Sequence, residues 1–439
     1  MHKRISTVAA LVLTLGAGTA HAVDEAVIQK SFYPYKDWTP TFEGYEPGMV
    51  INQGNVEQFK PILDEALYKF IKDGWVEVKT APTTSTPLSE DYIEATRKYA
   101  DQVKLNPNGT LSGYVAGRAF PQEPDPNDPK AGQKLVWNYQ YGFNSGDSET
   151  IEPFWWTYRD IKTGKVERVL KFSWHFMNYV HRVTFPPKPA FPESENPDKI
   201  FRGIYSRVLE PFDLKDTQLL IHRYIDDTKR DDAWLYLGFQ RRVRRLATGQ
   251  VTDAFLGSDL MIEDFEGYNG RVSDYTWEYG GTRNLLLPFY YHNEQELASV
   301  PENDPDGYKF VDVHGKGNCF PKVTYQLRKT YTLIGKPKDP NHPIGKRVIN
   351  LDSQTMTMAS LVTYDKKGDM WKWFPIGKAY SEKGHLKVNQ GKGVSLDDYA
   401  VLIDIQANHC TTLQFKSQIT DDVNQPRLFS VQNLRKVGR

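Results

Sequence analysis

Residues 226–267 read DDTKRDDAWLYLGFQRRVRRLATGQVTDAFLGSDLMIEDFEG, and they hold the clearest indications of the fold. The run from Trp234 to Leu237 is apolar on both faces of a strand, so this strand would be covered on each side. An arginine-dense strand follows it, and a Gly-Ser-Asp turn then leads into Glu263-Asp264-Phe265. The stretch contains no nucleophile motif, metal cage or phosphate loop. It indicates a β protein and gives no sign of catalysis.

Other parts of the chain alternate between apolar and polar side chains, as strands with one buried face do. The longest such runs are 166–180 and 323–333, and turns ending in Gly164 and Gly368 favour β-hairpins. Further strands are expected over 348–351, 355–364, 370–374 and 400–406. Together with a few helices, these runs predict an α+β fold built on one large curved antiparallel sheet. Such a sheet can bury its apolar face by packing on helices or by curling into an unclosed half-barrel whose interior holds a ligand.

The expected helices lie early in the chain. Apolar residues recur at helical spacing from Val56 to Ile71, with Asn55 able to cap the first amides and Gly74 as a natural stop. Pro61 either kinks this helix or begins a second one. A second short helix is expected over 89–100, and 106–132 is expected to be a long surface loop. We therefore divide the chain into a signal peptide (1–22), an N-terminal segment with helices and a Pro-rich loop (23–136), and a β-sheet domain (137–439).

The first 22 residues have the pattern of a secretory signal peptide. A basic start and an apolar core over 8–15 precede Ala20-His21-Ala22, a small-x-small cleavage site. The apolar core is short for a bilayer span, so a retained anchor is the weaker alternative. No Cys lies near the cleavage point, so we expect an exported protein of the periplasm that is not lipidated.

The charges of the chain balance, with 55 basic and 55 acidic residues. This balance argues against a nucleic-acid partner, which requires a basic face. The chain has two cysteines, Cys319 and Cys410, 91 residues apart (410 − 319). In an oxidising compartment they can form one bridge that ties two late strands together; the alternative is two separately buried thiols.

Aromatic residues on the predicted strands are candidates for the lining of a hydrophobic cavity, since Tyr and Trp can meet water or a headgroup with their polar tips. The alternative is that each belongs to an ordinary sheet core. The candidates are Phe172, Trp174, Phe176, Trp234, Tyr236, Tyr325 and Tyr331.

The arginine-dense strand carries Arg241, Arg242, Arg244 and Arg245 on both of its faces, which predicts a position at a sheet rim or a cavity mouth. These guanidinium groups are candidates for contact with a ligand headgroup or with an acidic partner surface. The alternative is a network of salt bridges with the nearby acidic residues.

Nothing in the sequence predicts an enzyme. Acidic residues are adjacent at 231–232, 263–264 and 397–398, and on a strand such neighbours point to opposite faces, although carboxylates from different segments can still converge. No nucleophile elbow or catalytic Cys–His pattern occurs. The spacing of His175 and His181 suits neither a strand face nor a helix turn for chelation, so no metal and no cofactor is expected.

Short motifs over nearly the whole mature chain are specific in combination. They are NVEQF (55–59), GYVAG (113–117), DPKAG (128–132), LVWN (135–138), RKTY (328–331), DPNHP (339–343), YD (364–365) and RKVGR (435–439). With 226–267 they resemble the family named domain of unknown function 1329, of the outer-membrane lipoprotein-sorting type. The resemblance implies an unclosed β-barrel with helices plugging its open side. It also implies association with an inner-membrane permease of the resistance–nodulation–division class and with a β-rich outer-membrane partner. No catalytic residues come with it.

Three functional hypotheses follow. The first is a soluble periplasmic carrier or adaptor that shields a lipid or another hydrophobic molecule. The missing lipidation cysteine favours such a shuttle over a fixed receptor. The second is a secreted carbohydrate-binding or carbohydrate-active protein with solvent-facing aromatic platforms. The third is a scaffold of a transport complex, whose interior would be solidly packed by its own side chains.

Overall fold

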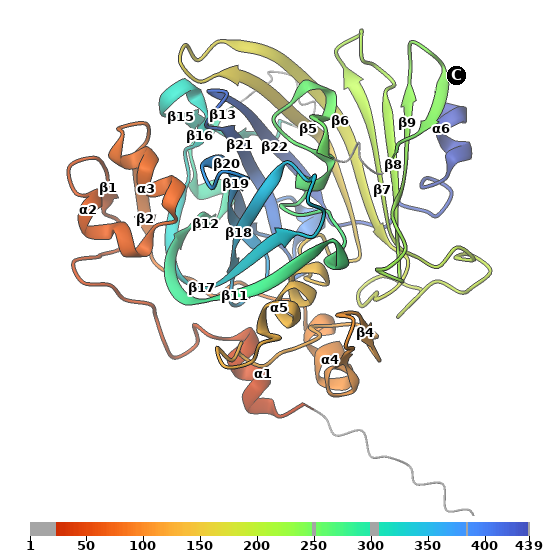
Figure 1. The fold of residues 1–439 in the computed structure, drawn as a ribbon, viewed down its shortest axis with the longest axis horizontal. Helices are drawn as coiled ribbons and strands as arrows, with labels where there is room; N and C mark the ends of the chain where they lie inside the picture. The colour runs from red at the N-terminus through yellow and green to blue at the C-terminus, as the bar shows by residue number, and fades with distance from the viewer. Residues whose placement is uncertain (1–22, 248–251, 299–306, 383–384, 438–439) are drawn as a thin grey trace, which may run out of the picture.

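A computed structural model describes residues 23–247, 252–298, 307–382 and 385–437, and one large sheet dominates it (Figure 1). Its hydrogen-bonded order is β11 (Tyr275–Leu287), β17 (Thr324–Pro337), β18 (Ile344–Asp352), β19 (Met358–Asp365), β20 (Met370–Tyr380), β21 (Ser395–Asp404), β22 (His409–Gln418), β5 (Ser148–Asp160), β6 (Val166–Asn178), β7 (Ile200–Glu210), β8 (Gln218–Tyr224), β9 (Asp232–Leu237) and β10 (Arg242–Arg245). Short strands extend it: β2 (Val78–Ala81) pairs with β17 and β1 (Val50–Ile51), and β12 (Phe289–Tyr290) pairs with β20. All pairings are antiparallel except those of β2 with β17 and β12 with β20.

The sheet curls without closing, which confirms the predicted half-barrel. Among the described residues no pairing joins β10 to β11, the two ends of the main order. β10 has only four residues, three of them arginines, and a short, charged edge strand resists pairing with another edge.

The helical pattern over 56–71 folds as three short pieces instead of one helix. They are α2 (Val56–Phe59), the 3-10 turn η1 (Lys60–Ile62) that contains Pro61, and α3 (Glu65–Lys72). Asn55 makes no side-chain cap, because its amide oxygen accepts from the Asn52 amide instead. Asp64 caps α3 by accepting from the Leu67 amide at 2.7 Å. Gly74 ends the helical region with φ of +69°.

The remaining helices lie around the opening and the far edge of the sheet (Figure 1). They are α1 (Glu25–Phe32), α4 (Glu90–Tyr99), α5 (Ala131–Gln140) and α6 (Val431–Val437). α5 packs on β11, and α6 contacts β8, β9 and β10. The predicted loop over 106–132 contains β4 (Leu111–Ser112), which pairs with β3 (Lys104–Leu105), and α5 crosses the predicted boundary at 136. No helix among the described residues is long and apolar enough to cross a membrane, and the predicted signal peptide (1–22) lies outside them.

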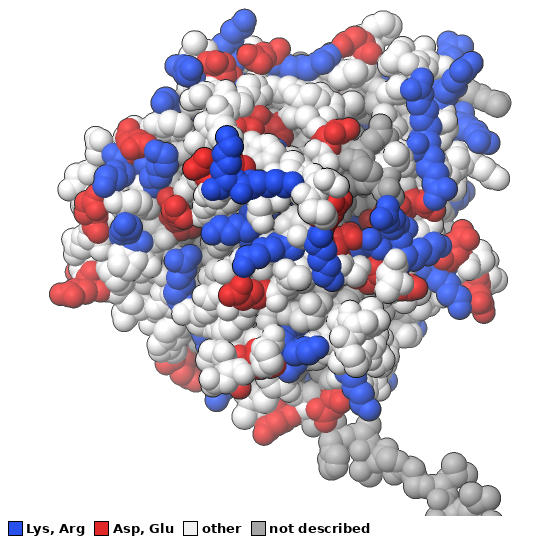
Figure 2. Space-filling model, in the orientation of Figure 1, with Lys and Arg blue, Asp and Glu red and all other residues white. Residues whose placement is uncertain are grey.

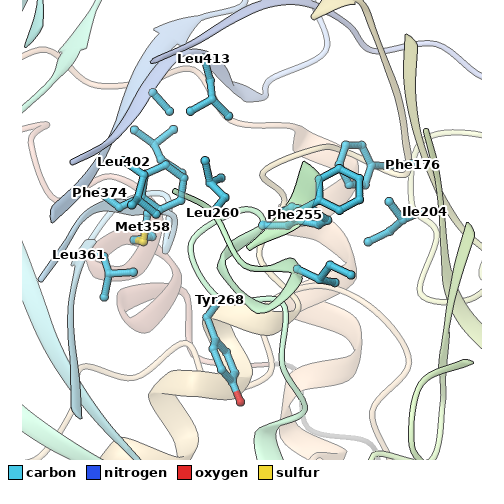
Figure 3. Packing of buried hydrophobic residues seen from close by; sticks show 14 of the residues in the cluster. Phe176, Ile204, Phe255, Leu260, Tyr268, Met358, Leu361, Phe374, Leu402 and Leu413 are labelled. Carbon is cyan, nitrogen blue, oxygen red and sulfur yellow. The ribbon is translucent and has the colours of Figure 1, made fainter. Parts of the chain in front are cut away.

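Two apolar clusters lie on opposite faces of the sheet. Neighbouring residues of β20 show the division, since Trp373 belongs to one cluster and Phe374 to the other. We call the cluster that contains Trp373 the outer cluster; α2 and α3 cover it. The cluster that contains Phe374 is the inner cluster, and it fills the concave side of the half-barrel (Figure 3).

A disulfide joins Cys319 and Cys410, with their Cα atoms 6.2 Å apart. Cys410 lies on β22, whereas Cys319 lies in the loop between the 3-10 turn η8 (Lys316–Asn318) and β16 (Phe320–Pro321). The bridge therefore fastens a loop to the sheet. The sequence had predicted that it would tie two strands together.

Candidate functional site

The concave side of the sheet is filled by the chain that connects β10 to β11. We call residues 254–274 the plug segment. It has no regular helix or strand, only the 3-10 turns η4 (Phe255–Gly257), η5 (Ile262–Asp264) and η6 (Val272–Asp274). Its apolar side chains lie between Phe176 and Ile204 on one wall and Phe374 and Leu402 on the other (Figure 3). The plug side chains in the inner cluster are Phe255, Leu260, Ile262, Phe265, Tyr268 and Val272.

Under the plug segment lies a wall of aromatic rings from β5 and β6. Phe265 meets Trp174 edge-on at 5.1 Å, and Phe255 meets Trp156 edge-on at 5.9 Å. Edge-to-face packing of this kind is favourable between aromatic rings. The plug leaves a cavity of about 40 Å³ against this wall. An apolar protein cavity of about 150 Å³ holds one benzene molecule, so the cavity in this conformation is too small for an acyl chain.

Buried ion pairs hold the middle of the plug segment to β18. The Arg347 guanidinium, fully buried, donates from Nη1 to Asp264 Oδ1 at 2.7 Å and from Nη2 to Glu263 Oε2 at 2.9 Å. Tyr275 donates to Glu263 as well, at 3.0 Å, and His342 Nε2 lies 3.1 Å from it. Burial alone would raise the pKa of Glu263, but the charges of Arg347 and His342 outweigh it and lower that pKa to about 2. The plug thus carries two carboxyl groups into the interior, both paired with Arg347.

Two further contacts, at Glu266 and at Asp259, hold the plug segment to other strands. Arg202 on β7 pairs with both carboxylate oxygens of Glu266, at 2.7 and 2.9 Å. On β22, His409 Nδ1 lies 2.7 Å from Asp259 Oδ2, and Thr411 donates to the same oxygen at 2.7 Å. The hydrogen bond to Asp259 raises the pKa of His409. Lys372 of β20 also lies 3.9 Å from Asp264. The plug is therefore attached by charge to four strands of the half-barrel, β7, β18, β20 and β22.

The small cavity beside the plug segment is mainly apolar but is bordered by carboxyl groups of Glu149, Glu266 and Asp397. Asp397 pairs with Lys378. Burial, together with the charge of Asp397, raises the pKa of Glu149 to about 8. A neutral carboxyl group both donates and accepts hydrogen bonds, so Glu149 can bind an uncharged polar atom next to an apolar surface.

A second, more polar cavity of about 50 Å³ lies where the plug segment meets α5. Glu266 borders both cavities. His181 donates from Nδ1 to the Val115 carbonyl at 2.7 Å, and its buried Nε2 has no hydrogen-bond partner among the described residues. Burial lowers the pKa of His181 to about 4, so the ring is neutral. It presents an unused acceptor at the edge of this cavity.

Four of the seven predicted cavity aromatics lie on the inner face: Phe172, Trp174, Phe176 and Tyr331. The prediction that the other three share this cavity is wrong. Trp234 and Tyr236 point to the other face of β9, where they pack in a cluster with Phe429 and Leu434 beneath α6. Tyr325 lies in the first part of β17, which pairs with β2 rather than β18, and it packs in the outer cluster.

The arginine strand lies at the rim of the sheet, as predicted. The proposed salt-bridge network is mostly absent: within the described chain only Arg245 has an ion pair, with Asp232. Two of the acidic residues downstream, Glu263 and Asp264, belong to the plug segment and pair with Arg347 instead. Glu263 and Asp264 point toward the same arginine because they lie in a 3-10 turn, whereas adjacent residues of a strand would point to opposite faces.

One histidine cluster was not recognised from the sequence. His292, His385 and Asp398 are buried, with ligating atoms within 4.8 Å of one another. His292 donates to Asp398 at 2.9 Å and to the Lys309 carbonyl at 3.1 Å. His385 accepts from the Asn389 amide at its Nδ1, so its Nε2 carries the proton. A metal ligand must be unprotonated, so the tautomer of His385 fits a hydrogen-bonded cluster better than a metal centre. These residues lie 93 and 13 positions apart, outside any motif spacing.

Comparison of the sequence with known proteins places the chain in a family. Residues 50–435 match the model described as protein of unknown function (DUF1329). Uncharacterized protein PA3922 of Pseudomonas aeruginosa is 25% identical over 358 residues, which are 78% of this chain and 71% of that protein.

Among solved structures, a DUF1329 family protein from Desulfovibrio piger has 18% identity and a TM-score of 0.47, over 71% of this chain and 99% of that one. A putative outer membrane lipoprotein-sorting protein domain from Vibrio parahaemolyticus has 13% identity and a TM-score of 0.47, over 70% and 100%. On the extent of the family match, the chain belongs to the DUF1329 family of proteins of unknown function.

Proposed function

We propose that this protein is a periplasmic carrier that shields a hydrophobic molecule on the concave face of its half-barrel. The observation that carries the proposal is the plug segment itself. An irregular loop, attached by ion pairs, covers an aromatic wall that a permanent core would cover with a helix or a second sheet. Loops are seldom buried, because their backbone groups need partners, and a buried loop of this length is usually functional.

In this proposal the ligand replaces part of the plug segment as the covering of the aromatic wall. The existing cavity is too small for an acyl chain, so the ligand must displace part of the plug segment from Trp174 and its neighbours. Burial of each CH₂ contributes about 0.8 kcal/mol, so a long chain can compensate for the lost plug contacts. The released carboxylates of the plug would be hydrated outside the barrel. Glu149 and His181 would then bind the polar end of the ligand.

The two other hypotheses are less well supported. Trp and Tyr platforms that face solvent are rare: Trp38 is the one exposed tryptophan among the described residues, at 45%, and it stacks on Tyr35. That argues against sugar binding on an open surface. The scaffold hypothesis predicts a packed interior, and the interior is packed in this conformation. The two remaining hypotheses therefore differ in whether the plug segment can leave.

The partners of the carrier belong to the proposal and rest on the family resemblance. We propose that it exchanges its cargo with a permease of the resistance–nodulation–division class and with a β-rich outer-membrane protein. Cross-linking in cells, followed by identification of the linked proteins, tests this part. If neither class of protein is recovered, the proposed partners are rejected, and the proposal of ligand binding is unaffected.

Native mass spectrometry of the protein purified from periplasm without detergent, combined with lipid extraction, tests the carrier. We expect a bound acyl or polycyclic species, or uptake from added lipid. Trp174→Asp places a charge on the aromatic wall and should abolish binding, whereas Val423→Asp, at an exposed site, should not. Phe265→Ala removes the ring of the plug segment that packs on Trp174, so it should raise the uptake of lipid. Circular dichroism establishes that each variant folds.

A protein free of ligand that takes up no lipid, with Phe265→Ala equally inert, would reject the carrier and support the scaffold. Retention of cargo by a folded Trp174→Asp variant would show that the ligand binds elsewhere.

A further inference from the structure

Two neighbouring turns at one end of the sheet expose the most accessible large apolar side chains of the described chain. Phe212, in the turn between β7 and β8, is 92% exposed, and Phe239, between β9 and β10, is 71% exposed. The turns contact each other: a Cβ atom on Gly238 would lie 2.6 Å from the Lys215 carbonyl oxygen. They lie at the top of the view in Figure 1, beyond the ends of β7 to β10. We call residues 211–216 and 238–242 the tip.

The tip and its surroundings carry excess positive charge. Each acidic residue beside it already has a basic partner: Glu210 pairs with Lys171, Asp213 with Arg168, and Asp216 with Arg207. Exposed basic side chains without such a partner in the described part of the chain remain, namely Lys215, Arg241, Arg242 and Arg244. Lys and Arg side chains gather over β9 and β10 at the upper right of Figure 2.

Exposed phenylalanines surrounded by arginines match the chemistry of an anionic lipid surface. Aromatic rings insert at the boundary between headgroups and acyl chains, and basic side chains around them attract anionic headgroups. Neither feature helps folding, since a phenylalanine that is 92% exposed buries almost nothing. An acidic protein surface would match the arginines but would leave both rings in water unless it also offered an apolar pocket.

We propose that the tip docks the protein on an anionic lipid bilayer, with Phe212 and Phe239 inserted and Arg241 and Arg242 on the headgroups. This site is distinct from the concave interior and does not depend on the carrier proposal. Docking would be reversible, because two aromatic side chains and a few charges give far less affinity than a membrane-spanning helix.

Flotation of the full mature chain with vesicles tests the tip. One set is phosphatidylcholine alone, and the other contains one third phosphatidylglycerol. We expect binding to the anionic vesicles that falls as salt increases. Phe212→Ser with Phe239→Ser should lower the partition coefficient roughly a hundredfold, about tenfold for each ring removed from the membrane. Arg241→Gln with Arg242→Gln should lower binding roughly tenfold, and only to the anionic vesicles.

Matched controls are Val423→Ser, which removes another exposed apolar residue, and Lys98→Gln with Lys104→Gln, which removes two exposed charges elsewhere. Both should bind vesicles as the unchanged protein does. All substituted positions at the tip are exposed, so folding is expected to survive, and circular dichroism verifies it. Absence of vesicle binding, or binding that the phenylalanine variant does not weaken, would overturn the proposal. If the arginine variant instead lost a protein partner in cells with vesicle binding unchanged, the tip would be a protein-docking surface.

Discussion

The two coverings of the sheet are held in place by different forces. On the outer face, Phe70 of α3 packs against Trp373 at 5.3 Å and Phe320 at 5.5 Å, and the disulfide at Cys410 lies in the same cluster. On the inner face, the apolar side chains of the plug segment also pack on the sheet, but ion pairs with Arg347, Arg202 and His409 add to its attachment. Apolar packing is lost only when water enters the core, whereas ion pairs can separate into hydrated groups. Under the carrier proposal we therefore expect the outer layer to stay in place and the plug to leave.

The largest expected effect is on the outer side. Phe70→Ala deletes a fully buried ring from the outer cluster and should lower the free energy of unfolding by about 4 kcal/mol. Denaturant unfolding measures it, and hydrogen exchange should accelerate throughout the sheet. Phe212→Ala, at a ring that is 92% exposed, is the control and should change stability by less than about 0.5 kcal/mol. If hydrogen exchange accelerated only in α2 and α3, the outer layer would not be part of the cooperative core.

A somewhat smaller and more local effect is expected for Arg347→Met. It leaves Glu263 and Asp264 buried without their partner, which should destabilise the attachment of the plug by about 3 kcal/mol. Hydrogen exchange should accelerate over 254–274 while α3 keeps its protection.

The triple variant Arg347→Met, Glu263→Gln, Asp264→Asn is the matched control for Arg347→Met. It removes the uncompensated charges, so a large part of the lost stability should return. If α3 and the plug segment loosened equally in Arg347→Met, the distinction between the two coverings would fail.

Much of the fold could be predicted from alternation, because each strand that contributes to one buried face obeys a period of two. β6 is an example: Phe172, Trp174 and Phe176 lie on the inner side as expected. Trp234 and Tyr236 were misplaced because β9 is apolar on both faces, and its sequence cannot tell which face meets α6 and which the interior. Tyr325 was misplaced because β17 changes its partner strand along its length.

The plug segment could not be predicted for a different reason. It has no helical or strand periodicity, and its fixed positions depend on partners far away in the sequence. Glu263 was noticed, but Arg347 lies 84 residues later, just before the strand predicted over 348–351. The cluster of His292 and Asp398 was missed in the same way, since 106 residues separate the two. Local patterns predict which side chains are buried, whereas long-range ion pairs depend on the topology.

The smallest predicted effect concerns pH and one end of the plug segment. The pKa of His409 is raised by Asp259, so this contact is fully formed below the ordinary histidine pKa and is lost as the pH rises through the raised value. A charged hydrogen bond of this kind contributes about 1 kcal/mol. Protection factors of amides near Asp259 should therefore fall about fivefold between acidic and alkaline pH.

The variant His409→Asn should show no such pH dependence. Amides near Glu266 provide an internal control, because Arg202 keeps its charge over the whole range. Equal pH dependence near Asp259 and near Glu266 would show that the plug opens as one unit, and its charged attachments would then have to be released together before a ligand could enter.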